Sequence, residues 1–318
     1  MPLAGLLKPL IVTMLLAGAI GTATAEDALK IAVGQRGGWE QCVSELGQNA
    51  GIFKRHGLAL DVLYTQGSGE TLQSVLSASV DVGIGIGTHS VLGAYAKGAP
   101  VRAIGSSFTS ADDQFYYVVA DSPIQSMKDA DGKTIAISTT GSASNIFALA
   151  LAKHFGVALK PQPTGAYAAT LTQTLTKQVD IGFSQAPFNL NAVDEGKIRI
   201  VAMGRDVPAL RQMTSRLIIA NTAILAQKKP LLQRYMAGFI ETLDWLYSDP
   251  AAIKAYAAWS GLPENVARRA PEFLTKANLD PRHISGLDAI MADAVTFKYL
   301  AAPLSAAQLA EVIQIPLK

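Results

Sequence analysis

The sequence contains a single cysteine, Cys42, among 318 residues. One cysteine excludes an internal disulfide and any metal site built from several thiolates, and we interpret Cys42 as a small buried apolar residue. The sequence also lacks the HExxH, GxSxG and Walker motifs, and no cysteine stands at a recognisable spacing from a histidine. We therefore predict no catalytic residue, no metal site and no cofactor.

Charged side chains are also scarce, since Asp, Glu, Lys and Arg make up only 16% of the chain and its formal net charge is +2. No basic run is longer than the pair Lys228 and Lys229. Nucleic-acid binding needs a basic stripe or patch, which this sequence does not provide. The hydrophobic fraction of 49% is enough to build the cores of two domains.

The first 25 residues differ in composition from the rest of the chain. Lys8 is their only charged residue, the run from Leu10 to Ile20 is almost entirely apolar, and Ala23-Thr24-Ala25 fits a small-residue cleavage site. This pattern is typical of a secretory signal peptide. The apolar run is shorter than the ~20 residues that a membrane-spanning helix needs. We expect cleavage near Ala25 and a periplasmic mature protein.

The chain contains an internal repeat. The phrase VDVG begins at Val80 and the phrase VDIG begins at Val179. Upstream of each, a short apolar run leads through a glycine-containing loop into a helix with a similar ending, KRHGLAL at 54–60 and KHFGVAL at 153–159. Apolar strands that alternate with helices predict parallel α/β packing, and two copies predict two similar lobes.

Several repeated residues have structural interpretations. Gly57 and Gly156 suit the left-handed residue that ends a helix, and a histidine in the last turn is favoured by the helix dipole. Asp81 and Asp180 precede buried strands, so we expect them to accept hydrogen bonds from neighbouring backbone. These positions are therefore interpreted as structural.

Two extended apolar stretches, 114–120 and 215–221, bracket the second copy of the repeat. We interpret them as strands at the two crossings between the lobes. The predicted domains are a discontinuous first lobe, 26–117 and 218–318, and a second lobe, 118–217. The predicted fold class is α/β, with a mainly parallel sheet flanked by helices in each lobe.

The sequence resembles the periplasmic solute-binding proteins of ABC importers in the nitrate, sulfonate, taurine and pyrimidine-precursor group. The resemblance rests on the signal peptide, QNAGIFKRHGL at 48–58, VDVG at 80–83, DGKTIA at 131–136 followed by Gly141-Ser142, and WLYSDP at 245–250. These motifs span nearly the whole mature chain in the same order.

This resemblance implies the two-lobed type II periplasmic-binding fold. It also implies a protein that closes its lobes on a small-molecule solute and delivers the solute to a membrane permease. The implied partners are this permease and, through it, its ATPase. Contact with the membrane complex would be peripheral, and no bond would be made or broken. Pyrimidine synthases that share this fold carry a cysteine-rich motif that is absent here, which disfavours an enzyme.

The most informative candidate binding loop lies in the second copy of the repeat, between its first strand and the helix that follows. Free backbone amides at a helix start, together with hydroxyl groups, can hold an anionic group without a lysine. Simple N-capping of the helix is the alternative interpretation. The candidate residues of this loop are Thr139, Thr140, Gly141, Ser142, Ser144 and Asn145.

The matching loop of the first lobe contains Gln35, Arg36 and Trp39. Arg36 could pair with a carboxylate or sulfonate, and Trp39 could cover an apolar or aromatic body. Alternatively, Arg36 is solvated and Trp39 packs within its own lobe. The neighbouring Glu40 argues against a purely anionic site.

Four further segments are expected to face the same cleft, because ligands of open α/β sheets bind beyond the carboxyl ends of the strands. A plain turn is the alternative for the first of these segments, and Arg205 is the weakest candidate. The candidates are Gly67, Ser68 and Gly69 after the second strand, Thr88 and His89 after the third, and Ser184, Gln185 and Arg205 in the second lobe.

The sequence therefore predicts a solute-binding subunit of an ABC importer. The expected solute is a small organic anion such as a sulfonate, a nitrate-like ion or an aromatic carboxylate. A pyrimidine or thiamine-precursor type of heterocycle is the alternative solute class. A cofactor-free enzyme and a sensor module on the same fold are the alternative functions.

Overall fold

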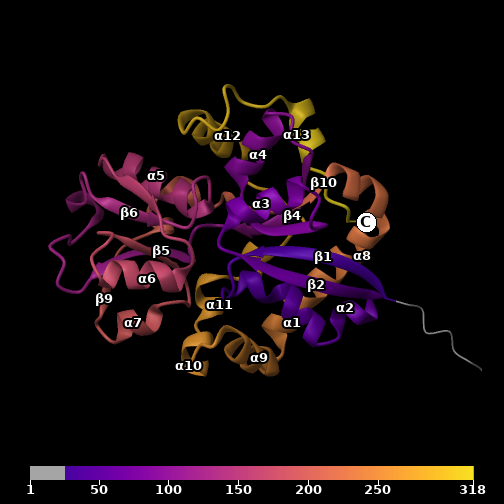
Figure 1. The fold of residues 1–318 in the computed structure, drawn as a ribbon, viewed down its shortest axis with the longest axis horizontal. Coiled ribbons are helices and arrows are strands. Elements are labelled where there is room, and N and C mark those ends of the chain that lie inside the picture. The colour runs from indigo at the N-terminus through magenta and orange to yellow at the C-terminus, as the bar shows by residue number, and fades with distance from the viewer. Residues whose placement is uncertain (1–25, 318) are drawn as a thin grey trace, which may run out of the picture.

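The computed structural model describes residues 26–317, so the predicted signal peptide lies outside the described residues. The chain forms two lobes, one built on a five-stranded sheet and the other on strands from the middle of the sequence (Figure 1). We call these units lobe 1 and lobe 2. The strands of lobe 1 are β1 (Asp27–Gly34), β2 (Leu58–Thr65), β3 (Val82–Gly87), β4 (Val101–Thr109) and β10 (Thr214–Asn221).

The sheet of lobe 1 has the order β2-β1-β3-β10-β4. β1 pairs in parallel with β2 and β3, whereas β10 runs antiparallel to β3 and β4. β3 and β10 are buried along their whole length, because helices cover both faces of the sheet, as is usual for parallel sheets. The N-terminal helices of this lobe are α1 (Val43–Asn49), α2 (Ile52–Arg55), α3 (Ser68–Leu76) and α4 (Thr88–Ala96).

The strands of lobe 2 are β5 (Gln114–Val119), β6 (Thr134–Ile137), β7 (Lys160–Pro163), β8 (Gly182–Gln185) and β9 (Ile198–Met203). Its helices are α5 (Ala143–Phe155), α6 (Tyr167–Leu175) and α7 (Leu190–Asp194). The sheets β6-β7 and β8-β5-β9 are joined by a parallel bridge between Ile135 and Ile181. The resulting order, β7-β6-β8-β5-β9, repeats that of lobe 1, with β5 in the antiparallel position of β10.

The two copies of the repeat have matching hydrogen bonds. Asp81 accepts a hydrogen bond from the backbone amide of Lys30 at 2.9 Å, and Asp180 accepts one from Thr134 at 2.8 Å. Each aspartate thereby joins the start of one strand to the strand beside it. The structural interpretation of the VDVG and VDIG phrases is confirmed. Gly57 and Gly156 likewise end their helices at φ of 68° and 69°.

The chain crosses between the lobes twice, once between β4 and β5 and once between β9 and β10. β5 and β10 begin directly after these crossings. β5 pairs only within lobe 2 and β10 only within lobe 1. We therefore propose that the domain boundaries lie in the two connections, a few residues before the predicted positions inside β5 and β10.

Helices from the C-terminal third complete lobe 1. They are α8 (Thr222–Ser248), α9 (Pro250–Ser260), α10 (Glu264–Ala267), α11 (Ala270–Phe273), α12 (Leu287–Thr296) and α13 (Ala306–Val312). The apolar face of α8 is buried against the sheet, as its helical spacing predicts. In Figure 1, α12 and α13 lie beside α4, on the side of lobe 1 opposite to α9 and α10.

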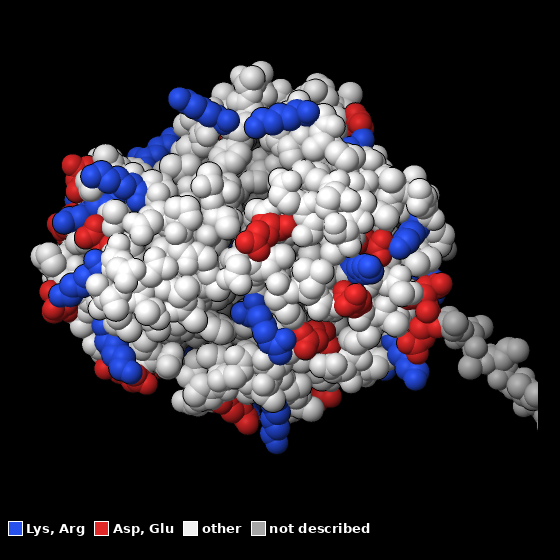
Figure 2. Space-filling view, in the orientation of Figure 1, with Lys and Arg blue, Asp and Glu red and all other residues white. Residues whose placement is uncertain are grey.

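Figure 2 shows basic and acidic side chains interspersed over one face of the molecule, without a continuous stripe of either sign. Within residues 26–317, no helix combines the length and apolar character that a membrane span requires. The same residues contain no group of three or more His, Cys, Asp or Glu side chains arranged to hold a metal ion.

Candidate solute-binding cleft

A small polar cavity lies between the two lobes, beyond the carboxyl ends of β1, β6 and β8. Its volume is about 30 Å³, which corresponds to one or two water molecules, so the lobes are closed tightly on each other. We call it the inner cavity. Its lining residues are Gly34, Gln35, Gln41, Gly67, Ser68, Gly85, Gln114, Ser138, Ser142, Ala143, Ser144, Tyr167, Phe183, Gln185 and Arg216.

Two helix N-termini, one from each lobe, reach this cavity. α3 begins at Ser68 in lobe 1 and α5 begins at Ala143 in lobe 2, and both residues line the cavity. The side chain of Ser142 caps α5 by accepting a hydrogen bond from the amide of Asn145 at 3.2 Å. The first amides of each helix have no acceptor within the helix. The cavity thus receives the positive ends of two helix dipoles.

The lobes also meet through polar side chains in the cavity. Gln35 donates to the carbonyl of Gly165 at 3.4 Å, and the amide of Gly69 donates to the hydroxyl of Thr139 at 3.3 Å. The Oε1 atom of Gln35 is buried and has no hydrogen-bond partner among the described residues. The cavity therefore contains one acceptor that is available to a donor group of a solute.

Among residues 26–317, Arg216 is the one charged side chain that lines the inner cavity. Its Nε atom lies 2.6 Å from a carboxylate oxygen of Glu40, and its Nη2 atom donates to Asp113. Its guanidinium also lies over the ring of Phe108, at 4.6 Å from the ring centroid. All three charged side chains are at least 95% buried. The guanidinium is neutralised by two carboxylates, so it offers no free positive charge to a solute.

Burial and charge pairing shift the pKa values of Asp113 and Arg216. Removal from water raises the pKa of Asp113 to about 6, and the nearby Glu40 acts in the same direction against the opposing Arg216. Burial alone would lower the pKa of Arg216, but the adjacent carboxylates outweigh it and hold the pKa above its ordinary value. Arg216 therefore stays charged, and Asp113 titrates within two units of neutral pH.

The structure brings six of the residues predicted from the sequence together at the inner cavity. They are Gln35, Gly67, Ser68, Ser142, Ser144 and Gln185. Gly69 and Thr139 lie at the adjoining contact between the lobes.

Three predicted residues lie elsewhere for identifiable reasons. Arg36 is half exposed, pairs with Glu45 at 3.3 Å, and so does not line the cavity. Trp39 is fully buried in the core of lobe 1, where its indole N–H donates to the hydroxyl of Tyr247 at 2.9 Å. Arg205 is exposed and its guanidinium contacts the sulfur of Met203. The alternative interpretation, that Trp39 packs within its own lobe, is therefore confirmed.

Thr88, His89 and Ser184 are buried but also do not line the cavity. Thr88 donates to the carbonyl of Thr214 at 2.6 Å, and Ser184 donates to the carbonyl of Phe188 at 3.0 Å. Burial lowers the pKa of His89 to about 4, so its imidazole is neutral at physiological pH. Thr88 and Ser184 thus satisfy backbone carbonyls of their own surroundings, whereas Nε2 of His89 is buried without a hydrogen-bond partner among the described residues.

The candidates predicted from the sequence omit seven lining side chains. Arg216 carries the clearest signal, because an arginine inside a fully buried apolar strand requires buried partners. Those partners are distant in sequence. The omitted residues are Gln41, Gln114, Ser138, Ala143, Tyr167, Phe183 and Arg216.

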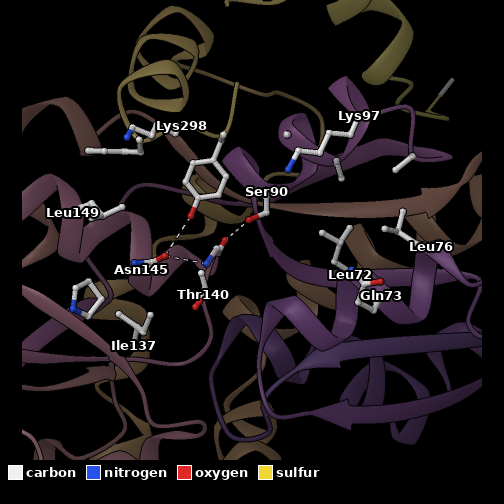
Figure 3. Close-up of a pocket in the computed structure, with 17 residues that line it drawn as sticks. Leu72, Gln73, Leu76, Ser90, Lys97, Ile137, Thr140, Asn145, Leu149 and Lys298 are labelled. Atoms are coloured by element: carbon white, nitrogen blue, oxygen red, sulfur yellow. Dashed lines mark hydrogen bonds between the residues drawn. The ribbon is translucent and has the colours of Figure 1, made fainter. Parts of the chain in front are cut away.

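A second, larger hollow lies on the other side of the loop that contains Thr140 (Figure 3). This outer groove has a volume of about 770 Å³ and is lined by α3, α4, α5 and the turn after α12. The predicted residues Thr140, Gly141 and Asn145 line it instead of the inner cavity. The loop 138–145 is therefore a wall between two hollows. Lys97 and Lys298 are the charged residues of the groove lining.

Hydrogen bonds across this groove connect the lobes (Figure 3). The hydroxyl of Ser90 on α4 donates to the carbonyl of Gly141. The amide of Gly141 donates to Oδ1 of Asn145 at 3.0 Å, and the hydroxyl of Tyr299 donates to the same oxygen at 3.3 Å. Two residues of lobe 1 thus bind the loop and helix of lobe 2 in the closed arrangement.

Solved structures with the same fold include binding proteins and an enzyme. The chain is 20% identical to the alkanesulfonate-binding protein SsuA from Xanthomonas axonopodis pv. citri, with 92% of this chain and 100% of that chain covered and a TM-score of 0.74. It is 12% identical to the periplasmic nitrate-binding protein NrtA from Synechocystis PCC 6803, with 90% and 85% covered and a TM-score of 0.67. It is 18% identical to the desulfurization enzyme DSZB, with 91% and 97% covered and a TM-score of 0.63.

These similarities establish the two-lobed periplasmic-binding fold. The protein sequence gives no match among curated proteins. The family model described as NMT1/THI5 like matches residues 46–253, well over half of the chain. The chain therefore belongs to the NMT1/THI5-like family.

Proposed function

We propose that this protein is the extracytoplasmic solute-binding subunit of an ABC importer, which captures a small solute between its lobes and delivers it to a membrane permease. Periplasmic localisation follows from this role and from the predicted signal peptide. The family and the sulfonate- and nitrate-binding neighbours support the proposal.

One observation carries this proposal, namely that polar groups of both lobes converge on one closed cavity. Gln41 of lobe 1 and Gln185 of lobe 2 form hydrogen bonds with each other there, and α3 and α5 direct their N-termini at it. A solute that contacts both lobes stabilises the closed form relative to the open form. Closure then reports to the permease that the solute is bound.

Two solute classes remain in competition. The helix N-termini favour the small organic anion that the sequence predicts. Two features favour the heterocycle instead. Arg216 is neutralised by Glu40 and Asp113, and the acceptor Oε1 of Gln35 receives no hydrogen bond from a donor. An anion near two buried carboxylates would be repelled, whereas a neutral heterocycle with N–H groups would not. We therefore favour the heterocyclic solute over the anion.

The enzyme alternative draws support from the similarity to DSZB. Against it, the described residues place no nucleophile and base together in the inner cavity, whose lining contains no histidine or cysteine. A solute recovered chemically unchanged after incubation with the protein supports binding over catalysis. A sensor role is distinguished by whether permease and ATPase genes lie beside this one.

The experiment that tests the proposed function begins with the purified mature protein. Mass spectrometry of the denatured sample identifies any solute that co-purifies, and thermal-shift measurements compare small anions with pyrimidines. A solute at 100 times its dissociation constant stabilises the protein by ~2.7 kcal/mol. The proposal fails if no solute co-purifies and no compound of either class raises the unfolding temperature.

A further inference from the structure

Gln41 and Gln185 face each other across the inner cavity, one from each lobe, and each donates a hydrogen bond to the other. Nε2 of Gln41 lies 3.3 Å from Oε1 of Gln185, and Nε2 of Gln185 lies 3.4 Å from Oε1 of Gln41. These distances are long for N–H···O hydrogen bonds. The two amides therefore form a reciprocal but weak pair that shorter bonds to a solute can replace.

Neighbouring groups fix the orientation of this pair. The hydroxyl of Tyr167 donates to Oε1 of Gln185, so the Nε2 atom of Gln185 is directed at Gln41. A Cβ on Gly38 would lie 1.9 Å from Oε1 of Gln41, so the missing side chain at position 38 makes room for the Gln41 amide. Gln41 and Gln185 are 3% exposed each. The cavity thus holds two buried, oriented amides that belong to different lobes.

We infer that Gln41 and Gln185 are the specificity-determining residues, and that the solute carries an amide-type edge, with an N–H donor and a carbonyl or ring-nitrogen acceptor side by side. Primary amides, ureas, lactams and amino-substituted nitrogen heterocycles have such an edge. Each glutamine would form hydrogen bonds with the solute in place of those with the other glutamine, so the solute would contact both lobes. This inference rests on the proposed function, because it names the solute class of the same cavity.

The other side chains of the cavity lining suit a neutral, planar molecule of this kind, which enters when the lobes part, because the closed cavity of about 30 Å³ has room for only one or two water molecules. Its one charged side chain, Arg216, is already paired with two carboxylates. Gln35 supplies a further acceptor without a partner, and the aromatic rings of Tyr167 and Phe183 supply flat apolar surface. An oxyanion offers acceptors only, so it would leave the buried acceptors of Gln35 and Gln41 without donors, while Oε1 of Gln185 would keep the hydroxyl of Tyr167.

The same arrangement couples recognition to closure. Without solute, the two glutamines satisfy each other through two long hydrogen bonds. With an amide-edged solute between them, each glutamine gains its own pair of hydrogen bonds, and these form only when both lobes contact the solute. A solute that lacks either the donor or the acceptor can form only one of the two hydrogen bonds with each glutamine, so it stabilises the closed form less.

The test compares matched amides and acids at pH 7.5 by calorimetry. Suitable pairs are nicotinamide with nicotinate and benzamide with benzoate, which differ in the N–H donor and the charge but hardly in shape. We expect the amide of each pair to bind at least tenfold more tightly than its acid. Equal or tighter binding of the acids overturns the inference and leaves solute capture by the cleft intact.

Variants locate the effect in the glutamine pair. Gln41→Met and Gln185→Met keep the side-chain volume and remove the amide, so each should weaken nicotinamide binding about tenfold and reduce the preference for nicotinamide over nicotinate. Gln178→Met, at an exposed position of lobe 2, is the matched control and should change neither. Thermal unfolding checks that all variants fold.

Tyr167→Phe tests the positioning role of the hydroxyl and should weaken nicotinamide binding by a smaller factor, about threefold, which Gln178→Met does not reproduce. Unchanged nicotinamide binding in both glutamine variants overturns the inference. If no amide and no acid binds, and nothing co-purifies with the protein, the proposed function fails together with the inference.

Discussion

Gly87 of lobe 1 lies directly against the backbone of Gly141 in lobe 2. A Cβ built on Gly87 would be 3.1 Å from the carbonyl oxygen of Gly141 and 3.1 Å from the amide nitrogen of Ala143. Both atoms belong to the backbone of the other lobe, so they can give way only if the lobes separate slightly. The tight closure of the cleft therefore depends on the absence of a side chain at position 87.

Gly87→Ala should weaken solute binding while leaving the fold intact. Gly87 has φ −54° and ψ 125°, which alanine adopts without strain, so the added methyl acts on closure alone. We expect about a tenfold loss of affinity, which corresponds to ~1.4 kcal/mol against the closed form. Calorimetry measures the affinity, and small-angle scattering should show a larger radius of gyration.

Gly132→Ala serves as the contrasting control for this prediction. Gly132 has φ +72° and open space around its Cβ position. Alanine there should lower the free energy of unfolding by ~1 kcal/mol through backbone strain without changing the affinity. An unchanged affinity in Gly87→Ala would contradict the proposed role of position 87.

Removal of the hydroxyls that link the lobes should also favour the open form. Ser90→Ala deletes the hydrogen bond to Gly141, and Tyr299→Phe deletes the one to Asn145. Each loss should cost ~1 kcal/mol of closure, or about fivefold in affinity. A double-mutant cycle checks the pair, and because both contacts reach the same loop we expect their effects to be non-additive. Wild-type affinity in both single variants would show that these contacts do not stabilise closure.

Asp113 and His89 should make the free energy of unfolding change with pH in opposite directions. The pKa of Asp113 is raised from its ordinary 3.8 to about 6, so the folded state binds more protons than the unfolded state between these values. Its contribution to the free energy of unfolding falls as pH rises through this window. The pKa of His89 is lowered from 6.5 to about 4, so its contribution instead rises with pH.

The two contributions, each ~3 kcal/mol at full size, nearly cancel between pH 4 and pH 6 in the wild type. Asp113→Asn should therefore lose stability more steeply on acidification than the wild type. His89→Gln should instead lose stability as pH rises through this window. Urea unfolding at pH 4, 5, 6 and 7 measures the slopes, and identical slopes in all three proteins would refute the assignment.

Arg216→Met should be among the most destabilising substitutions in the cleft. It leaves the buried carboxylates of Glu40 and Asp113 without their common partner, at a cost of ~3–5 kcal/mol. Combining it with Glu40→Gln and Asp113→Asn removes the uncompensated charges and should recover much of this loss. Urea unfolding of the single and triple variants provides the comparison. Equal stability of the two variants would show that charge pairing is not the cause.

The sequence was most informative where local chemistry fixes local structure. The repeated pattern identified the VDVG and VDIG phrases, in which Asp81 and Asp180 accept hydrogen bonds from backbone. Residues close to one another in the chain identified the helix ends at Gly57 and Gly156. Such patterns predicted two α/β lobes, and the two sheets have the same strand order.

The binding loops were predicted less completely, because a helix start indicates where a polar loop lies but not the direction in which each side chain points. Loop 138–145 illustrates this limit. Ser142 and Ser144 line the inner cavity, while Thr140 and Asn145 line the outer groove. Neighbouring residues of one loop face opposite sides, and the sequence contains no signal that distinguishes the sides.

By itself, then, the sequence determined the duplicated α/β architecture, because apolar periodicity and backbone capping act over a few residues. Only the tertiary structure decided which polar groups meet in the cleft. Arg216 is paired with Glu40 and Asp113, and Gln41 with Gln185, over separations of more than 100 residues in most cases. The Gln41–Gln185 pair forms when the two lobes close on each other, and the Arg216–Glu40 pair forms when lobe 1 itself packs. Long-range packing, rather than any local pattern, therefore sets the charge and hydrogen-bonding character of the cavity.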